Sequence, residues 1–240
     1  MKDNITVDKA KFNQFLQLIE LKGDITNREA ILSITPTSMQ VLAVSPNKTV
    51  ALKGELKGDF KLNKQIGIDE LDLLKNLANT FTDEKIQLEI KENKLLLTSK
   101  KDKLKVSSIL RDPKYITNII EPEKLESLLK QAKGNNIVLE KEVIDKILQY
   151  TTAINADALV LKGDKKKITL ELESNQNKIV AEFNTKKDFK PFEVKFAKIF
   201  VDLFSVINTD VTISVNKDAP VYLNLKEKDL EFEYVIAPIK

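Results

Sequence analysis

The sequence has no cysteine, no histidine and only 6 glycines. Without cysteine and histidine there are no disulfides, thiolate nucleophiles or Ser-His-Asp triads, and nearly every zinc, copper or haem site is excluded. The glycines form neither a GxGxxG nor a GxxxxGK[ST] motif, which argues against a nucleotide-phosphate cradle. A carboxylate-bound Mg²⁺ site is left open, but the acidic residues are scattered among lysines and no cluster stands out. An enzyme is therefore a poor hypothesis, and we expect no metal and no cofactor.

Long hydrophobic runs are also absent. No segment approaches the ~20 consecutive apolar residues that a membrane span needs. The first residues, MKDNITVDKAK, lack the apolar core of a signal peptide. We therefore expect an intracellular protein without a membrane partner. The formal net charge of +3 is only mildly basic, so it permits a nucleic-acid partner without requiring one.

Apolar periodicity predicts four main helices and a larger number of strands. The helical pattern occurs at residues 11–21, 69–81, 141–154 and 197–207. Strand patterns occur at residues 30–34, 38–44, 49–56, 85–90, 94–99, 103–109, 158–162, 167–173, 178–183, 211–215, 221–225 and 230–236. Strands and helices thus alternate in blocks, which is typical of an α+β protein.

The two halves of the chain repeat the same order of elements. Leu74 and Leu77 align with Phe200 and Leu203, and the flanking strands align at nearly the same offset. Short amphipathic segments align by chance, but agreement over some hundred residues favours a duplicated α+β domain. We expect domain 1 at residues 1–111, a connector at 112–135 and domain 2 at 136–240. Each domain is predicted as β-α-βββ-α-βββ.

The solvent faces of the predicted helices are polar and rich in amides, as at Gln14, Gln17, Asn76 and Gln149. One such helix is an ordinary solvated helix. Four similar faces suggest a surface that makes only weak contacts with a partner.

The segment VKFAKIFVDLFSVINTDVTISVNKDAPVYLNLKEKDLEFEYVIAPIK, residues 194–240, resembles the closing helix and strands of the DNA sliding clamps of the proliferating-cell-nuclear-antigen fold, phage relatives included. Residues 66–90 and 154–171 resemble other parts of the same fold. The resemblance implies two clamp domains per subunit and three subunits in a ring, with helices inside and antiparallel sheets outside. It also implies a processivity factor that encircles duplex DNA without reading its sequence. DNA polymerase, a clamp loader and two further copies of the chain are the implied partners.

Positions can be carried over from the family by this resemblance. The implied DNA-facing residues are Lys9, Lys11, Lys22, Lys75, Lys146 and Lys198. The implied subunit interface joins Leu104, Val106 and Ser108 to Ile179, Ala181 and Phe183. The implied pocket for partner peptides is lined by Val44, Ile116, Pro220, Val235, Ala237 and Pro238. The connector is longer than usual and is predicted to contain a helical turn at Leu125, Leu128 and Leu129.

Other readings remain open at this point. A monomeric viral-type processivity factor of the same fold would hold DNA by a strongly basic face, which the modest charge disfavours. Subunits of checkpoint clamps form heterotrimers. A carboxylate-metal hydrolase on a repeated α+β scaffold is the alternative from a different class. For a clamp, the expected location is the replication fork, in the host cytoplasm for a phage or prokaryotic protein and in the nucleus for a eukaryotic one.

Overall fold

The computed structural model describes residues 4–216 and 219–237, apart from the side chains of residues 185–187, 189, 197 and 199. The chain forms two compact units. Unit 1 comprises Met1–Leu21, Thr26–Glu121 and Lys226–Phe232. Unit 2 comprises Lys22–Ile25, Pro122–Leu225 and Glu233–Lys240. The predicted connector, residues 112–135, is therefore divided between the units after Glu121.

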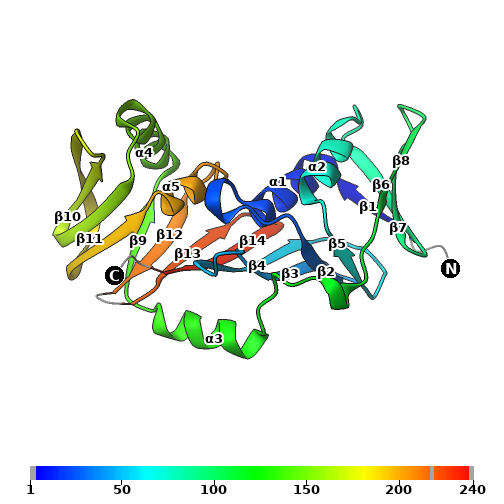
Figure 1. Ribbon diagram of the computed structural model, residues 1–240, viewed down its shortest axis with the longest axis horizontal. Helices are drawn as coiled ribbons and strands as arrows, with labels where there is room; N and C mark the ends of the chain where they lie inside the picture. The colour runs from blue at the N-terminus through cyan, green and yellow to red at the C-terminus, as the bar shows by residue number, and fades with distance from the viewer. Residues whose placement is uncertain (1–3, 217–218, 238–240) are drawn as a thin grey trace. The chain divides into compact units, whose positions relative to one another are not determined.

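Unit 1 is built from antiparallel strands and two α-helices. Its elements are β1 (Asn4–Asp8), α1 (Lys9–Glu20), β2 (Ala30–Ile34), β3 (Ser38–Val44), β4 (Val50–Lys57), β5 (Lys64–Ile68), α2 (Leu71–Asn79), β6 (Lys85–Lys91), β7 (Lys94–Ser99), β8 (Leu104–Ile109) and the short 3₁₀ helix η2 (Pro113–Tyr115). One sheet has the order β1-β6-β7-β8, and a second runs β5-β2-β3-β4 with β14 (Leu230–Ile236) beside β4. Helices α1 and α2 lie side by side (Figure 1).

Helix α1 begins and ends where its sequence provides partners for the free backbone groups. The Asp8 carboxylate accepts a hydrogen bond from the Lys11 amide at 3.0 Å, as an N-cap residue does. At the other end the chain turns at Leu21, whose φ is 61°, and the Asn27 amide donates to the Glu20 carbonyl at 2.7 Å. The apolar side of the helix is fully buried, so its opposite side is the one that remains for a partner.

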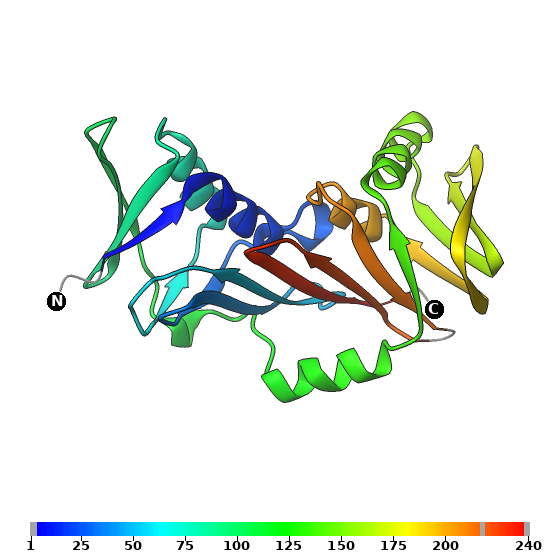
Figure 2. The ribbon, with the colours of Figure 1, turned by 180° about the vertical axis from the view of Figure 1, so that it is seen from behind.

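Unit 2 repeats this arrangement with longer strands. Its elements are η1 (Gly23–Ile25), α3 (Pro122–Gln131), β9 (Asn135–Leu139), α4 (Lys141–Ile154), β10 (Ala158–Glu173), β11 (Lys178–Ala197), α5 (Ile199–Phe204), β12 (Val211–Val215), β13 (Val221–Lys226) and the second half of β14. The strand order is β14-β13-β12-β9, and β10 pairs with β11. Seen from behind in Figure 2, β10 and β11 form one long two-stranded ribbon.

Aromatic side chains fill the core of each unit. In unit 1 the rings of Phe15 and Phe232 lie 5.6 Å apart, and Phe232 also covers Gly54, which has no side chain to obstruct it. In unit 2 Phe200 stacks on Phe196 at 4.2 Å and meets Phe204 edge-on at 4.6 Å. Such buried rings contribute much of the apolar area that stabilises a domain.

The predicted fold class is confirmed, but unit 1 has four strands, β2 to β5, and unit 2 has two, β10 and β11, where three were expected between the helices, and three boundaries differ. The α+β class, the antiparallel sheets and the helices in each half are all present. Helix α5 covers only Ile199–Phe204 instead of residues 197–207, because β11 extends to Ala197. The strands predicted at 158–162 and 167–173 form the single strand β10, which continues through register shifts near Lys165. The helical turn predicted in the connector is the ten-residue helix α3, with Leu125 buried.

Candidate nucleic-acid interface and partner surface

The lysines implied as DNA contacts in unit 1 are already engaged by acceptors of the same unit. The Lys9 ammonium donates to the Phe81 carbonyl at 2.7 Å. Lys11 forms an ion pair with Asp229, and Lys75 forms one with Glu20. The hydrogen bond and the charge of Asp229 raise the pKa of Lys11, although burial opposes the shift. The two carboxylates compensate the charges of Lys11 and Lys75, whereas Lys9 only donates a hydrogen bond to a neutral carbonyl.

Unit 2 combines one compensated lysine with two exposed ones. Lys146 on α4 pairs with Glu142 one turn earlier at 2.9 Å, and this bond raises the pKa of Lys146. Lys22 and Lys198 are exposed. Asp202 on α5 is partly buried, and this burial raises its pKa against the opposing charge of Lys198. An acidic side chain thus lies beside one of the two exposed lysines.

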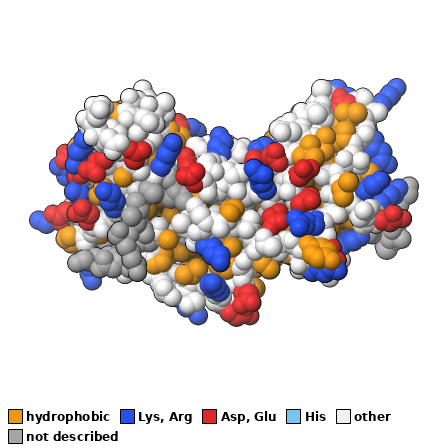
Figure 3. All heavy atoms as spheres, in the orientation of Figure 1, with side chains coloured by type: hydrophobic (Ala, Val, Ile, Leu, Met, Phe, Trp, Pro, Cys, Tyr) orange, Lys and Arg blue, Asp and Glu red, His pale blue; other side chains and the backbone are white. Residues whose placement is uncertain are grey.

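Positive and negative side chains are mixed on the face of the molecule that Figure 3 shows. Figure 3 shows lysines and arginines interspersed with aspartates and glutamates on the visible face, without a continuous field of either sign. Sequence-independent DNA binding depends on the number of phosphates that cations neutralise. A helix face with compensated lysines can therefore contact a duplex only weakly.

Strand β8 in unit 1 and strand β11 in unit 2 lie at open sheet edges, as do β1 and β5 in unit 1 and β9 and β10 in unit 2. Strand β8 pairs only with β7, and the stretch of β11 at residues 178–184 pairs only with β10. Ile109 on β8 is 67% exposed and Val180 on β11 is 53% exposed. Open edges with apolar residues are sites where another strand can pair.

The implied interface residues lie on these two edges. Leu104 is exposed, Val106 is half-buried and Ser108 is buried, so one side of β8 turns progressively into the unit. The set on β11 is uniformly half-buried: Ile179, Ala181 and Phe183. Each strand thus presents one partly covered side that a neighbouring strand would extend.

The residues implied as the peptide pocket differ in their exposure. Ile116 is 3% exposed and Val235 is 4% exposed, so both pack inside their own units. Val44 and Pro220 are half-buried and Ala237 is exposed. Pro238 lies outside the described residues. The described segment 111–121 instead exposes Tyr115 and Ile119, at 56% and 46%.

Tyr115 and Ile119 alternate with inward-facing neighbours. Ile116 and Ile120 are buried, which fixes the side of the segment that faces away from the unit. The Lys114 ammonium lies 4.8 Å from the centre of the Tyr115 ring, a cation–π arrangement that holds the ring at the surface. The sequence showed that this segment is too apolar for a free tether, but it did not show which residues point outward.

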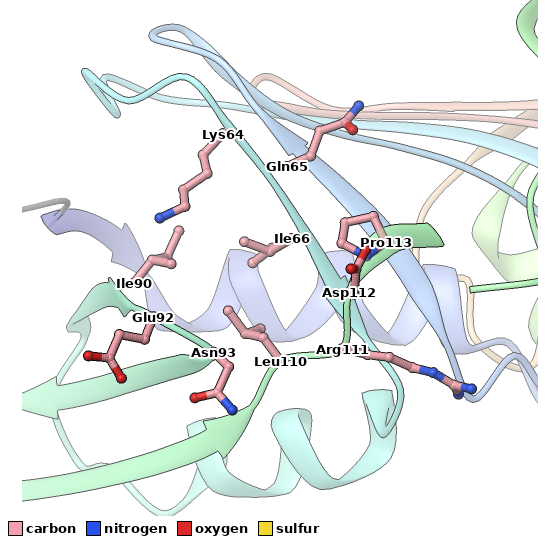
Figure 4. A pocket seen from close by; sticks show the side chains of 10 residues that line it. All are labelled: Lys64, Gln65, Ile66, Ile90, Glu92, Asn93, Leu110, Arg111, Asp112 and Pro113. Atoms are coloured by element: carbon pink, nitrogen blue, oxygen red, sulfur yellow. The ribbon is translucent and has the colours of Figure 1, made fainter. Parts of the chain in front are cut away.

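A pocket of about 250 Å³ lies where this segment leaves β8. Figure 4 shows Ile66, Ile90 and Leu110 directed toward one another inside it, whereas the Arg111 side chain extends away. The Arg111 amide donates to the Gly67 carbonyl at 2.9 Å. A side chain at position 67 would overlap the Arg111 carbonyl, so glycine permits this close approach.

No group of three or more Cys, His, Asp or Glu residues suited to hold a metal ion is found among residues 4–216 and 219–237. Within the same part of the chain, no helix is both long and apolar enough to cross a membrane.

Comparison with solved structures identifies the fold. A proliferating cellular nuclear antigen from Entamoeba histolytica matches with a TM-score of 0.82 and 15% identity, covering 100% of both chains. PCNA of A. fulgidus, bound to the C-terminal region of FEN-1, matches with a TM-score of 0.79 and 17% identity, covering 99% of this chain and 98% of that one.

The chain has the sliding-clamp fold. A putative DNA polymerase III beta subunit from Eubacterium rectale also has it, with a TM-score of 0.76 and 15% identity over 100% of this chain and 66% of that longer subunit. No family model and no curated protein sequence matches the chain. The expected fold is therefore confirmed from structure, at a sequence identity that carries no statement about residue roles.

Proposed function

We propose that this protein is a DNA sliding clamp, a non-enzymatic ring of three identical subunits that encircles duplex DNA and tethers a DNA polymerase. The observation that carries the proposal is the sliding-clamp fold over the whole chain, combined with the exposed apolar residues Ile109 and Val180 on the open edges of β8 and β11. Pairing β8 of one subunit with β11 of the next is a head-to-tail contact, and such contacts generate closed rings when the rotation closes. Three subunits close the proposed ring.

The proposed DNA-facing surface comprises the helices α1, α2, α4 and α5. Lys9, Lys11, Lys22, Lys75, Lys146 and Lys198 are its candidate contacts. A ring holds DNA by topology, so it does not need tight phosphate contacts, and strong contacts would oppose sliding. Neighbouring carboxylates compensate the charges of Lys11, Lys75 and Lys146. This compensation favours a ring over a monomeric factor, because a monomeric factor would need a strongly basic face to hold DNA.

Partner proteins are proposed to bind by short apolar peptides. PCNA of A. fulgidus was solved with the C-terminal region of FEN-1 bound. In this protein the exposed Tyr115 and Ile119 provide apolar contacts on the connector, with Val44, Pro220 and Ala237 as further candidates. A few apolar and aromatic anchors supply most of the affinity in small interfaces. A replicative polymerase and a clamp loader are the proposed partners, and the site of action is the replication fork.

Light scattering over a range of concentrations tests the ring. The wild-type protein should have about three times the 27.2 kDa mass of one chain. The double substitution Ile179→Glu and Ala181→Glu should give monomers, because the new carboxylates would be buried without partners between the paired strands. The matched control Val138→Glu places the same charge on an exposed residue of β9 and should leave the mass unchanged. A wild-type monomer at every concentration would refute the ring.

A further inference from the structure

Glu29 connects the end of the loop before β2 to the connector, which is more than 80 positions away in the sequence. Its Oε1 atom accepts hydrogen bonds from the Thr117 amide and the Thr117 hydroxyl, both at 2.7 Å, and from the Asn118 amide at 3.2 Å. Its Oε2 atom accepts from the Arg111 guanidinium at 3.3 Å. One carboxylate thus binds four donors from three residues of the segment 111–121.

The Glu29 side chain is only 13% exposed, whereas its bonds to Arg111 and Thr117 lie at the exposed surface and the bond to Asn118 is part-buried. Burial by itself would raise the pKa of Glu29, but the hydrogen bonds from Thr117 and Asn118 and the charge of Arg111 outweigh it and lower the pKa. The carboxylate is therefore charged at neutral pH and bonded through both oxygens. Charge-assisted bonds of this kind are stronger than bonds between neutral groups.

Two backbone hydrogen bonds also tie the segment 111–121 to the rest of unit 1. At the start, the Arg111 amide donates to the Gly67 carbonyl at 2.9 Å. Further on, the Val44 amide donates to the Asn118 carbonyl at 3.1 Å. Between these two ties, η2 is capped locally by Asp112, a bond that does not attach it to the rest of the unit. Glu29 and the buried Ile116 side chain therefore fix the part of the segment that carries Tyr115.

We propose that Glu29 is a positioning residue for partner binding, which holds the connector so that Tyr115 and Ile119 face outward in a fixed arrangement. This inference rests on the proposed function. Binding to an ordered surface avoids the entropic cost of ordering it, so loss of the anchor should weaken binding without removing any contact to the partner. A carboxylate suits the task because it accepts from two backbone amides, a hydroxyl and a guanidinium at once.

The test compares Glu29→Ala and Glu29→Gln with the control Glu55→Ala, which removes a glutamate that accepts from Gln40 on the neighbouring strand. Amide hydrogen exchange is measured at Thr117 and Asn118. Peptide affinity is measured by fluorescence anisotropy with labelled C-terminal peptides of FEN-1 and of replicative polymerases. Oligomeric mass and thermal unfolding are recorded for each variant, because a residue that merely stabilised the fold would change these first.

Glu29→Ala should raise exchange at Thr117 and Asn118 about ten-fold or more, because both amides lose their acceptor. It should weaken peptide binding about five- to ten-fold, with little change in mass or melting. Glu29→Gln keeps one acceptor oxygen and should rescue part of both effects, whereas Glu55→Ala should match the wild type.

Unchanged exchange in Glu29→Ala would overturn the anchor. Faster exchange with wild-type peptide affinity would overturn its role in positioning. A wild-type protein that binds none of the peptides would instead refute peptide binding in the proposed function, an outcome that is distinct from both.

Discussion

The compensated lysines make a quantitative prediction about DNA binding. Asp229→Asn removes the partner of Lys11, and Glu142→Gln removes the partner of Lys146. Each lysine released toward a phosphate should steepen the dependence of log affinity on log salt concentration by about 0.9. The double variant should therefore steepen this slope by up to about 2 per subunit.

The effect is large enough to measure. A slope change of about 2 corresponds to roughly a fifteen-fold greater loss of affinity between about 50 and 200 mM salt. Fluorescence anisotropy with a short labelled duplex gives this slope directly. Asp59→Asn is the matched control, because it removes the same charge from the exposed Lys61 pair, which is not on these helices.

Melting temperatures of all variants should be compared, so that unfolding is not mistaken for altered binding. An unchanged slope in the double variant would refute the reasoning that these carboxylates moderate the DNA-facing surface. An equal steepening by Asp59→Asn would refute it too, since the effect would then follow from net charge alone.

Three further predictions concern stability and ionisation. Phe232→Ala should lower the free energy of unfolding in urea by about 3–5 kcal/mol, because it empties a fully buried site against Phe15. Tyr115→Ala at the surface should change this free energy by under ~0.5 kcal/mol, and equal effects of the two substitutions would contradict the assigned core. The hydrogen bonds from Thr117 and Asn118 favour the charged form of the Glu29 carboxylate and lower its pKa. Protection of these two amides against hydrogen exchange, corrected for intrinsic exchange, should therefore be complete above the ordinary pKa of 4.5 and lost as the pH falls through the lowered pKa of the folded protein. Loss of protection between pH 6 and 8 would be inconsistent with these bonds. NMR titration of the Asp102 carboxyl carbon should give a pKa of about 2, because the Thr82 hydroxyl and amide donate hydrogen bonds to the charged carboxylate. Thr82→Val removes the hydroxyl and should return the pKa toward 3.8. A pKa of 3.8 in the wild-type protein would exclude these bonds.

The fold class and the helices could be predicted because they depend on local periodicity. The alignment of Leu74 with Phe200 and of Leu77 with Leu203 reflects two helices that bury the same side, and both helices are present. Element lengths were less predictable. Residues 163–166 carry only one glycine and polar residues, which is typical of a turn, yet pairing with β11 keeps them within β10.

The candidate site could be predicted only in part, because its electrostatics depend on residues far apart in the sequence. Lys11 and Asp229 are separated by 218 positions, so no local pattern indicates that they pair. Glu29 likewise lies more than 80 positions from its partners Arg111, Thr117 and Asn118, so no local pattern indicates these bonds. The apolar character of Ile116 pointed to a pocket, but burial decided that Tyr115 and Ile119 are the outward residues.

The central claim is that three subunits enclose a duplex, and crosslinking on DNA tests it most directly. Because the chain has no cysteine, Ser107→Cys on β8 and Glu182→Cys on β11 introduce the only thiols, both at exposed positions. The double variant is mixed in dilute solution with a nicked circular plasmid and treated with a short bis-maleimide. A covalent trimer should then remain on the circular plasmid in high salt and detergent, and cutting the plasmid at one site should release it. Absence of a covalent trimer, or equal retention on circular and linear DNA, would contradict the account.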